Sequence, residues 1–272
     1  MLWYPLQIPP SGHSKHHRQS MIFWTPTPQE IPLTLHLLQL VQKKKYDFPL
    51  KVDRPSSLYV VSKNRQRYVV KTYHRRHFAK TLRNLLLLPR AFSAYRLAYF
   101  FLEKSIPTPS PIAAVYQPLV GIAHLITPYL PAQSLHQLLP HHSAEFFPPS
   151  LPRLLGKAVG KMHRACVFHN DLKTSNILWQ PHPPYFHFVD LDHSQQTSVF
   201  SLRLASRDLS CLLAYGGWWA KKWGCLRFIR SYLQANPLPS SLRDKLFQKT
   251  LQKTHQRRLQ RKSLPPQYSL PF

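Results

Sequence analysis

Residues 169–192 read HNDLKTSNILWQPHPPYFHFVDLD, and this stretch decides how the rest of the chain is interpreted. Asp171 stands five residues before Asn176, and a second acid, Asp190, directly follows the apolar run 186–189. Carboxylate and amide oxygens are ligands that Mg²⁺ accepts, and a carboxylate also orients a hydroxyl nucleophile. The stretch therefore carries the groups needed to hold a metal against phosphates and to direct an attacking hydroxyl.

The order of these residues is that of a known catalytic segment. His-x-Asp-x-x-x-x-Asn, followed by a strand that ends in an acid, is typical of the protein-kinase-like fold. We therefore expect an α+β, two-lobed protein-kinase-like fold, with a small antiparallel β lobe carrying one helix and a larger helical lobe. In such a fold His169 supports the catalytic loop, and Asp208 near the start of a predicted helix holds the loop backbone. A solvent-exposed Asp208 is the alternative.

Upstream of this segment, the sequence predicts a hairpin of strands at 58–61 and 68–71. The second strand ends in Lys71, at the position where the fold carries the lysine that binds the α- and β-phosphates of a nucleotide. No GxGxxG motif precedes the hairpin, where the sequence reads KVDRPSSLYVV. Ser56 and Ser57, or their backbone amides, are candidates to cover the phosphates instead.

The charge of the chain is abnormal. The sequence has 37 Lys and Arg against 10 Asp and Glu, a net charge of +27, which favours polyanionic partners. Nucleic acid, anionic lipid headgroups and phosphorylated glycolipids all qualify, and charge alone does not rank them. The acids are clustered, because four of the ten lie within 38 residues: Asp171, Asp190, Asp192 and Asp208. This distribution indicates placement for chemistry.

Three cysteines without CxxC spacing argue against a disulfide framework or a zinc site and favour a reducing, cytoplasmic compartment. The first residues lack the apolar core of a secretion signal. No run approaches the roughly 20 apolar residues of a membrane span, so any membrane association is expected to be peripheral.

Four segments are expected along the chain. Residues 1–45 form a basic, Pro- and His-rich extension with a short helix over 31–45, residues 46–126 the nucleotide-binding lobe, residues 127–240 the helical catalytic lobe, and residues 241–272 a basic tail. The helix at 31–45 packs on a core or touches a membrane. A helix over 91–104 is expected in the first lobe, and its one acid, Glu103, stands at its end.

The chain resembles the lipopolysaccharide kinase (Kdo/WaaP) family, most closely the 3-deoxy-D-manno-octulosonic acid (Kdo) kinases of Gram-negative bacteria. The resemblance rests on these segments: YVVKTYHR at 68–75, RAFSAYRLAYFFLEKSIPTPSPIAA at 90–114, ITPYLP at 126–131, HNDLKTSNIL at 169–178, FVDLDHS at 188–194 and SRDLSCLL at 206–213.

The resemblance implies ATP as donor and Mg²⁺ as metal, with Asp171 orienting the acceptor and Lys173 near the transferred phosphate. Asn176 and Asp190 would hold the metal, and Lys71 would bind the α- and β-phosphates. The implied acceptor is a sugar hydroxyl of Kdo on lipid A, an anionic glycolipid, at the cytoplasmic face of the bacterial inner membrane. An anionic membrane surface is the second implied partner, and the protein would be peripheral.

Three departures from the family pattern stand out. Ala94 occupies the place of an acid, Asn170 the place of an arginine that often precedes the catalytic Asp, and no APE-like segment follows VDLD. A heptose kinase or another small-molecule kinase of the same fold remains open. A pseudokinase that binds a membrane or a partner is a further alternative. Nucleic acid is an unlikely partner, because the sequence has no zinc-finger, RNP or OB-type pattern.

Overall fold

The computed structural model describes residues 14–18, 21–53, 56–74, 90–141, 150–216 and 222–260. The chain divides into two compact units. One comprises Met1–Leu102 and Pro109–Pro131, and the other comprises Glu103–Thr108 and Ala132–Phe272. The division follows Pro131 rather than residue 126, because residues 127–131 stay with the first unit: the Tyr129 N–H donates to the Arg67 carbonyl oxygen at 2.9 Å.

The first unit is built on a seven-stranded antiparallel sheet, ordered β1-β2-β6-β7-β5-β4-β3. The strands are β1 (Ser14–Arg18), β2 (Met21–Thr25), β3 (Phe48–Asp53), β4 (Ser56–Lys63), β5 (Gln66–Tyr73), β6 (Ala113–Gln117) and β7 (Ile122–Pro128). The predicted hairpin is thus β4–β5, in the register Leu58↔Lys71.

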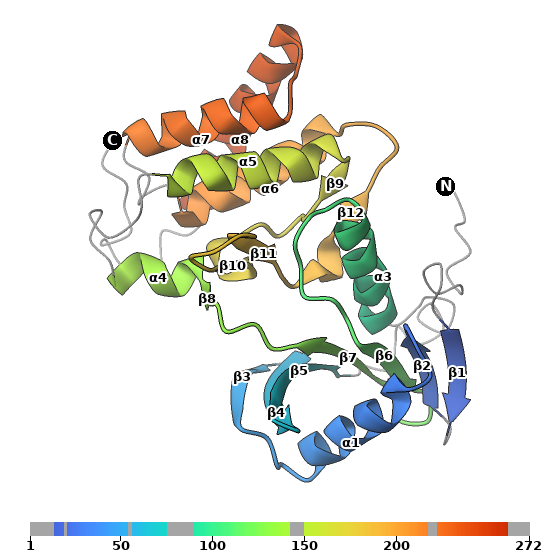
Figure 1. Cartoon of the computed structure of the whole chain (residues 1–272). Helices are drawn as coiled ribbons and strands as arrows, with labels where there is room; N and C mark the ends of the chain where they lie inside the picture. Colours follow the sequence, from blue (N-terminus) through green and yellow to red (C-terminus); the bar gives the residue numbers. More distant parts are fainter. Residues whose placement is uncertain are drawn as a thin grey trace. The chain divides into compact units, whose positions relative to one another are not determined.

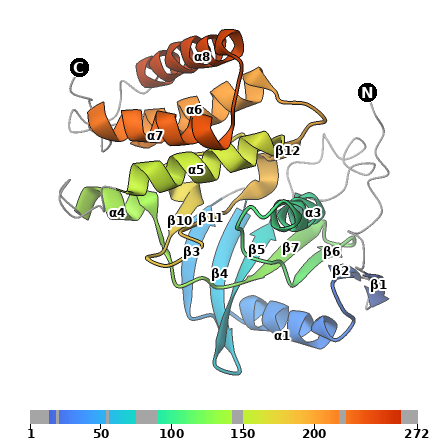
Figure 2. The same ribbon diagram turned by 45° about the horizontal axis from the view of Figure 1, so that its top comes forward.

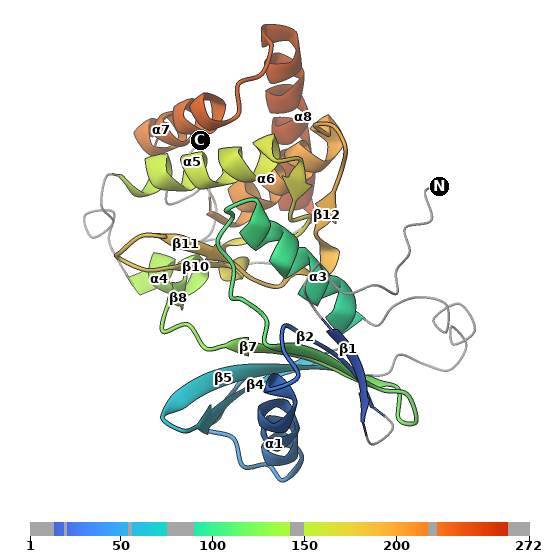
Figure 3. The ribbon, with the colours of Figure 1, turned by 45° about the vertical axis from the view of Figure 1, so that its right-hand side comes forward.

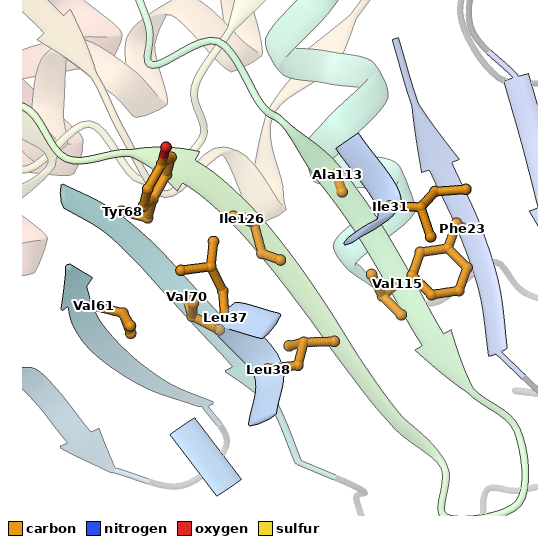
Figure 4. Packing of buried hydrophobic residues seen from close by; sticks show 10 residues of the cluster. All are labelled: Phe23, Ile31, Leu37, Leu38, Val61, Tyr68, Val70, Ala113, Val115 and Ile126. Atoms are coloured by element: carbon orange, nitrogen blue, oxygen red, sulfur yellow. The ribbon is translucent and has the colours of Figure 1, made fainter. Parts of the chain in front are cut away.

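Two helices cover opposite faces of this sheet, α1 (Glu30–Gln42) and α3 (Arg90–Glu103), as Figure 3 shows. Neighbouring residues of a strand point to opposite faces, and the two clusters of buried side chains follow this rule. Val70, Val115 and Phe23 pack with α1 residues (Figure 4), whereas Tyr73, Ala114 and Trp24 pack with α3 residues. Each face of the sheet is therefore covered by one helix.

The expected short helix over 31–45 is present as α1, at Glu30–Gln42, but the expectation of an N-terminal extension is wrong for residues 21–42. β2 pairs with β6, and its Phe23 and Trp24 are both fully buried, one on each face of the sheet. α1 packs on the sheet through Ile31 and Leu37. The Pro- and His-rich composition of this region gave no indication of strand β2. Its consecutive aromatic residues, Phe23 and Trp24, are both buried because a helix covers each face of the sheet. The β lobe accordingly carries α1 as well as α3, and residues 1–13 lie outside the described part.

The second unit is mainly helical. Its helices are α4 (Leu135–His141), α5 (Leu151–Arg164), α6 (Leu202–Gly216), α7 (Lys222–Ala235) and α8 (Ser240–Leu259). Its strands are short: β8 (Gln133–Ser134), β10 (Ile177–Trp179) and β11 (Phe186–Phe188) form one sheet, and β9 (Val167–Phe168) pairs with β12 (Gln195–Gln196). The resemblance segment at 169–178 follows β9 directly and runs into β10.

Two helix contacts organise this unit. α5 and α7 lie side by side (Figures 1 and 2) and approach closely at Gly156 and Gly160. A Cβ at Gly156 would stand 2.3 Å from the Phe228 carbonyl oxygen, and one at Gly160 would stand 2.6 Å from the Tyr232 carbonyl oxygen. Only glycine fits at such separations, so these two positions set the distance between the helices.

α8 corrects the expectation of a basic tail from residue 241. This helix packs on α6 and buries Leu246, Thr250 and Thr254. These residues are four apart, so they share one face of the helix. Because most residues of α8 are charged or polar, its sequence does not show the periodic apolar pattern from which a buried face is predicted. Residues 261–272 lie outside the described part.

Candidate active site

Asp208 of α6 holds the backbone of the catalytic loop. It is fully buried, and its two carboxylate oxygens accept the N–H groups of His169 (2.7 Å) and Asn170 (2.6 Å). Asn170 has a φ of 64°, the left-handed region that asparagine tolerates better than most residues. The structure thus places Asp208 against the loop as its anchor, 38 residues away in sequence, and not at the solvent-exposed surface.

The anchor extends through a buried chain of side chains that the sequence did not indicate. Oδ2 of Asp208 is 3.3 Å from Nε2 of His163, Nδ1 of His163 is 2.9 Å from the Tyr232 hydroxyl, and the Asn236 amide donates to that hydroxyl at 3.1 Å. With a proton on Nε2, His163 donates to Asp208 and can accept the Tyr232 hydroxyl at Nδ1, which satisfies every member of this chain. The loop is therefore tied to α5, α6 and α7 together.

Three further hydrogen bonds join the loop to the segment that carries Asp190. Nε2 of His169 donates to the Val189 carbonyl oxygen at 2.9 Å, and the Asn170 amide donates to the His193 carbonyl oxygen at 2.9 Å. The Ser194 hydroxyl reaches the His169 carbonyl oxygen at 3.4 Å. His169 is itself fully buried, so its place in the structure is that of a support between the two segments.

Asp171, Lys173 and Asn176 come together on this loop. Nζ of Lys173 is 2.9 Å from Oδ2 of Asp171, and both side chains are about one-third exposed, at 32% and 31%. The Asn176 amide nitrogen donates to the Asp171 carbonyl oxygen (2.9 Å) and to its Oδ2 (3.2 Å). The amide oxygen of Asn176 is consequently turned away from Asp171.

Asn176 is also attached to the strand that leads to Asp190. The Val189 N–H donates to the Asn176 carbonyl oxygen at 3.0 Å, and β10 pairs with β11 in the register Ile177↔Phe188. Asp190 follows immediately, in the left-handed conformation with φ 64° and ψ 53°, and it is exposed. Asn176 and Asp190 thus stand at the same end of one hairpin.

This donor set fits Mg²⁺. The ion is usually bound in proteins by one or two oxygen ligands, together with water and substrate phosphates. The Asn176 amide oxygen and the Asp190 carboxylate are of that type. No cluster of three or more His, Cys, Asp or Glu with metal-binding geometry occurs among the described residues.

Lys71 lies in the first unit. It is 8% exposed, and its Nζ is 4.9 Å from the centroid of the Tyr73 ring, on the α3 face of the sheet. Ala94 of α3 is buried. Glu103, the acid of this helix, pairs instead with neighbouring Lys104 at 3.5 Å on an exposed surface. The missing carboxylate noted in the sequence is therefore not supplied by Glu103.

A row of polar side chains crosses the other face of the sheet beside Lys71. The Ser57 hydroxyl is 2.9 Å from Nε2 of His74, and the Thr72 hydroxyl is 3.1 Å from Nδ1 of His124. Burial, with a smaller contribution from the charge of His74, lowers the pKa of His124 to about 4. The Ser57 side chain is buried and bonded to a histidine, so its hydroxyl is not available to cover phosphates.

Within the described ranges, no helix has the length and apolar character needed to cross a bilayer.

A solved structure described as "WaaP in complex with acyl carrier protein" matches with a TM-score of 0.58 and 20% sequence identity, covering 84% of this chain and 97% of that one. At this identity the match shows the fold, and it confirms the expected kinase-like α+β architecture. A search of curated proteins finds no match.

The model of the "Lipopolysaccharide kinase (Kdo/WaaP) family" matches residues 52–232. This range is more than half of the chain, and it contains Lys71, the catalytic loop, Asp190 and Asp208. The match confirms the resemblance read from the sequence and indicates a phosphotransferase of lipopolysaccharide. The chain belongs to the lipopolysaccharide kinase (Kdo/WaaP) family.

Proposed function

We propose that the chain is an ATP-dependent kinase that phosphorylates a sugar hydroxyl of Kdo in Kdo-lipid A. The observation that carries this proposal is the grouping of Asp171, Lys173 and Asn176 on a loop fixed by buried Asp208. Phosphoryl transfer needs little covalent chemistry from a protein and depends on position and on charge neutralisation. A rigid loop with an acid, a cation and an amide suits that requirement.

Each of these residues has a separate role in the proposed reaction. Asp171 accepts a hydrogen bond from the acceptor hydroxyl and directs it at the phosphate, because its carboxylate is partly exposed while Asn176 and Lys173 hold it in place. Lys173 offsets the negative charge of the transferred group. Asn176 and Asp190 would hold Mg²⁺, and the ion would supply neutralisation of the phosphate charge. Lys71 binds the α- and β-phosphates of ATP.

The proposed place of action is the cytoplasmic face of the bacterial inner membrane, where the protein is peripheral. Two properties support this. The acceptor is a lipid-anchored, anionic glycolipid, and a net charge of +27 favours anionic surfaces.

The test is incubation of the purified protein with ATP, Mg²⁺ and Kdo-lipid A, followed by mass spectrometry of the glycolipid. We expect the mass of one added phosphate. Asp171→Ala should lower the rate by about 10²- to 10⁴-fold with the thermal midpoint little changed. Lys71→Ala should raise the KM for ATP as well as lower kcat.

A matched control is Lys63→Ala, because Lys63 lies at the far end of β4 from the strand position paired with Lys71. It should leave the reaction unchanged. Phosphate added to a heptose-containing acceptor but not to Kdo-lipid A would redirect the proposal to a heptose kinase. Failure to bind Mg-ATP at all would favour the pseudokinase, a role consistent with Ala94 at the place of the helix acid.

A further inference from the structure

The exposed face of α5 carries only cations. Arg153, Lys157, Lys161 and Arg164 are the exposed positions of this helix. Their spacing of four, four and three residues aligns them in one stripe, about 17 Å long at the rise of an α-helix. The opposite face is buried through Leu151, Leu155, Val159 and Met162 among others. The stripe is therefore a surface feature that core packing does not require.

The stripe borders a groove between α5 and α7. The groove has a volume of about 980 Å³ and is lined by the four cations of the stripe, by Lys104, and on α7 by Ser231 and Gln234. Among the described residues that line it, none is acidic. Cations at i and i+4 repel one another, so this arrangement becomes favourable when an anionic group enters the groove.

The positive surface continues beyond this groove. A second hollow of about 530 Å³ shares Arg153, Ser231 and Gln234 with the first and adds Arg227 and Arg230 of α7. Leu226 stands beside them with 49% of its surface exposed. Leu226 and Arg230 are four residues apart, so they occupy the same face of α7. An exposed apolar side chain next to arginines is typical of an interfacial surface.

We propose that the α5–α7 groove docks the protein on a bilayer by binding the anionic headgroups of phospholipids, with Leu226 entering the headgroup region. The proposal rests on the proposed function, because a kinase for a lipid-anchored acceptor has to work at a membrane. Nucleic acid fits this groove less well. Single strands are bound by aromatic side chains on which bases stack, and the described residues lining the groove include no aromatic residue.

A second basic groove, between α6 and α8, provides an internal comparison. It has a volume of about 590 Å³ and is lined by Arg203, Arg207, Lys249, Lys253 and Arg257. Here Lys253 is engaged with the protein, donating to the Arg203 carbonyl oxygen at 3.1 Å and to the Ser206 hydroxyl at 2.9 Å. Three exposed cations of α8 lie outside the proposed surface and match in number the three cations removed from α5 below. They are Arg243, Lys245 and Lys249.

The experiment measures co-sedimentation of the full chain with vesicles of phosphatidylcholine, with and without phosphatidylglycerol, at rising NaCl concentration. The test variant is Arg153→Gln, Lys157→Gln and Lys161→Gln together. The matched variant is Arg243→Gln, Lys245→Gln and Lys249→Gln together, which removes the same net charge. Each cation at the surface contributes about a fivefold factor in binding, so the test variant should bind anionic vesicles about 100-fold more weakly.

We expect the matched variant to retain binding within a few-fold, and binding of the wild type to fall with salt. Equal losses in the two triple variants would overturn the proposal, since binding would then follow net charge and not this groove. So would strong binding of single-stranded RNA together with no preference for phosphatidylglycerol. Arg227→Gln with Arg230→Gln, on the other helix, repeats the test if the α5 variant unfolds at a lower temperature than the wild type.

Phosphoryl transfer to the soluble, deacylated sugar portion of the acceptor separates this proposal from the proposed function. Vesicle binding requires no ATP, so it stays measurable if the reaction fails. A test variant that has lost vesicle binding but phosphorylates the soluble acceptor at the wild-type rate would support the docking surface.

Discussion

Two buried histidines, one in each unit, show how differently the chain treats the same side chain. His163 in α5 is fully buried with both ring nitrogens partnered, by Asp208 and Tyr232. His124 in β7 is 5% exposed; its Nδ1 meets Thr72, while its Nε2 finds no hydrogen-bond partner within the described part of the chain. Two hydrogen bonds fix the ring of His163 in position, whereas burial lowers the pKa of His124 and so makes folding depend on pH.

The difference matters for function because the satisfied histidine supports the catalytic loop. Asp208 lies between His163 and the backbone of His169 and Asn170. The loop that carries Asp171 is therefore held by Asp208 of α6, which is held in turn by His163 of α5 and, through it, by Tyr232 of α7. Lys71 lies in strand β5 of the first unit. Helix α3 of the same unit has Ala94 at the position where the family pattern has an acid. Four substitutions test this difference between the two units.

The largest effect is expected for Asp208→Ala. It leaves two backbone N–H groups and Nε2 of His163 without acceptors in a buried site, which costs about 3–5 kcal/mol of unfolding free energy. Urea unfolding followed by circular dichroism measures this loss, and kinase activity should disappear with it. Asp208→Asn retains one oxygen acceptor and should lose less. A stable Asp208→Ala protein would show that the network does not hold the loop.

The pH dependence of the first unit comes next. His124 has its pKa lowered to about 4 by burial, while an unfolded histidine titrates near 6.5, so the unfolded chain binds the proton more readily. The neutral histidine's contribution is therefore complete above about pH 6.5 and is lost as the pH falls toward 4. The difference corresponds to about 3 kcal/mol.

The control for this effect is His124→Asn, which keeps a partner for Thr72 but does not titrate. Unfolding free energies of both proteins, measured by urea titration from neutral pH to about pH 4, should converge in acid. Parallel curves for the two proteins would show that His124 does not cause the loss.

A smaller effect is expected for Gly156→Ala. Alanine normally stabilises a helix relative to glycine, but here its Cβ would lie 2.3 Å from the Phe228 carbonyl oxygen. We expect α7 to shift at a cost of about 1–3 kcal/mol, which would also loosen the contact between Tyr232 and His163. The thermal midpoint measures the change. Lys157→Ala, on the exposed face of α5, should leave it unchanged, and a stabilised Gly156→Ala would contradict the close packing.

The smallest effect is expected for Tyr232→Phe. It removes the hydroxyl between His163 and Asn236, leaving each with one unmet hydrogen bond, at a cost of about 1 kcal/mol. Because Asp208 keeps its bonds to the loop, activity should stay within about twofold of the wild type. Loss of activity as severe as in Asp208→Ala would mean that Tyr232 positions the loop as strongly as the acid does.

Much of the site could be predicted because its residues are close in sequence. Asp171, Lys173 and Asn176 stand within one loop, and Asp190 is one short hairpin away, so their spacing indicated both the chemistry and the fold. The hairpin that carries Lys71 and the helix at 90–103 were likewise visible as local periodic patterns, although the second strand extends two residues beyond Lys71, to Tyr73. Their assigned roles in phosphate and metal binding stay predictions that the proposed experiments test.

The N-terminal strand and the last helix could not be predicted for a common reason. β2 has aromatic residues at consecutive positions, which makes sense only once helices cover both faces of the sheet. α8 has a narrow buried face among many charged residues. In both segments a residue's environment is set by an element distant in sequence, so local composition was misleading.

The sequence alone was enough to recognise the family and to group the candidate catalytic residues, because short-range spacing encodes the loop that brings an acid, a lysine and an amide together. Only the tertiary structure decided what holds that loop and what faces outward. The chain from Asp208 through His163 to Tyr232 joins residues up to 69 positions apart, and Gly156 and Gly160 allow the close approach of α5 and α7, the two helices that line the basic groove. Contacts of this kind depend on packing between elements, which no local pattern records.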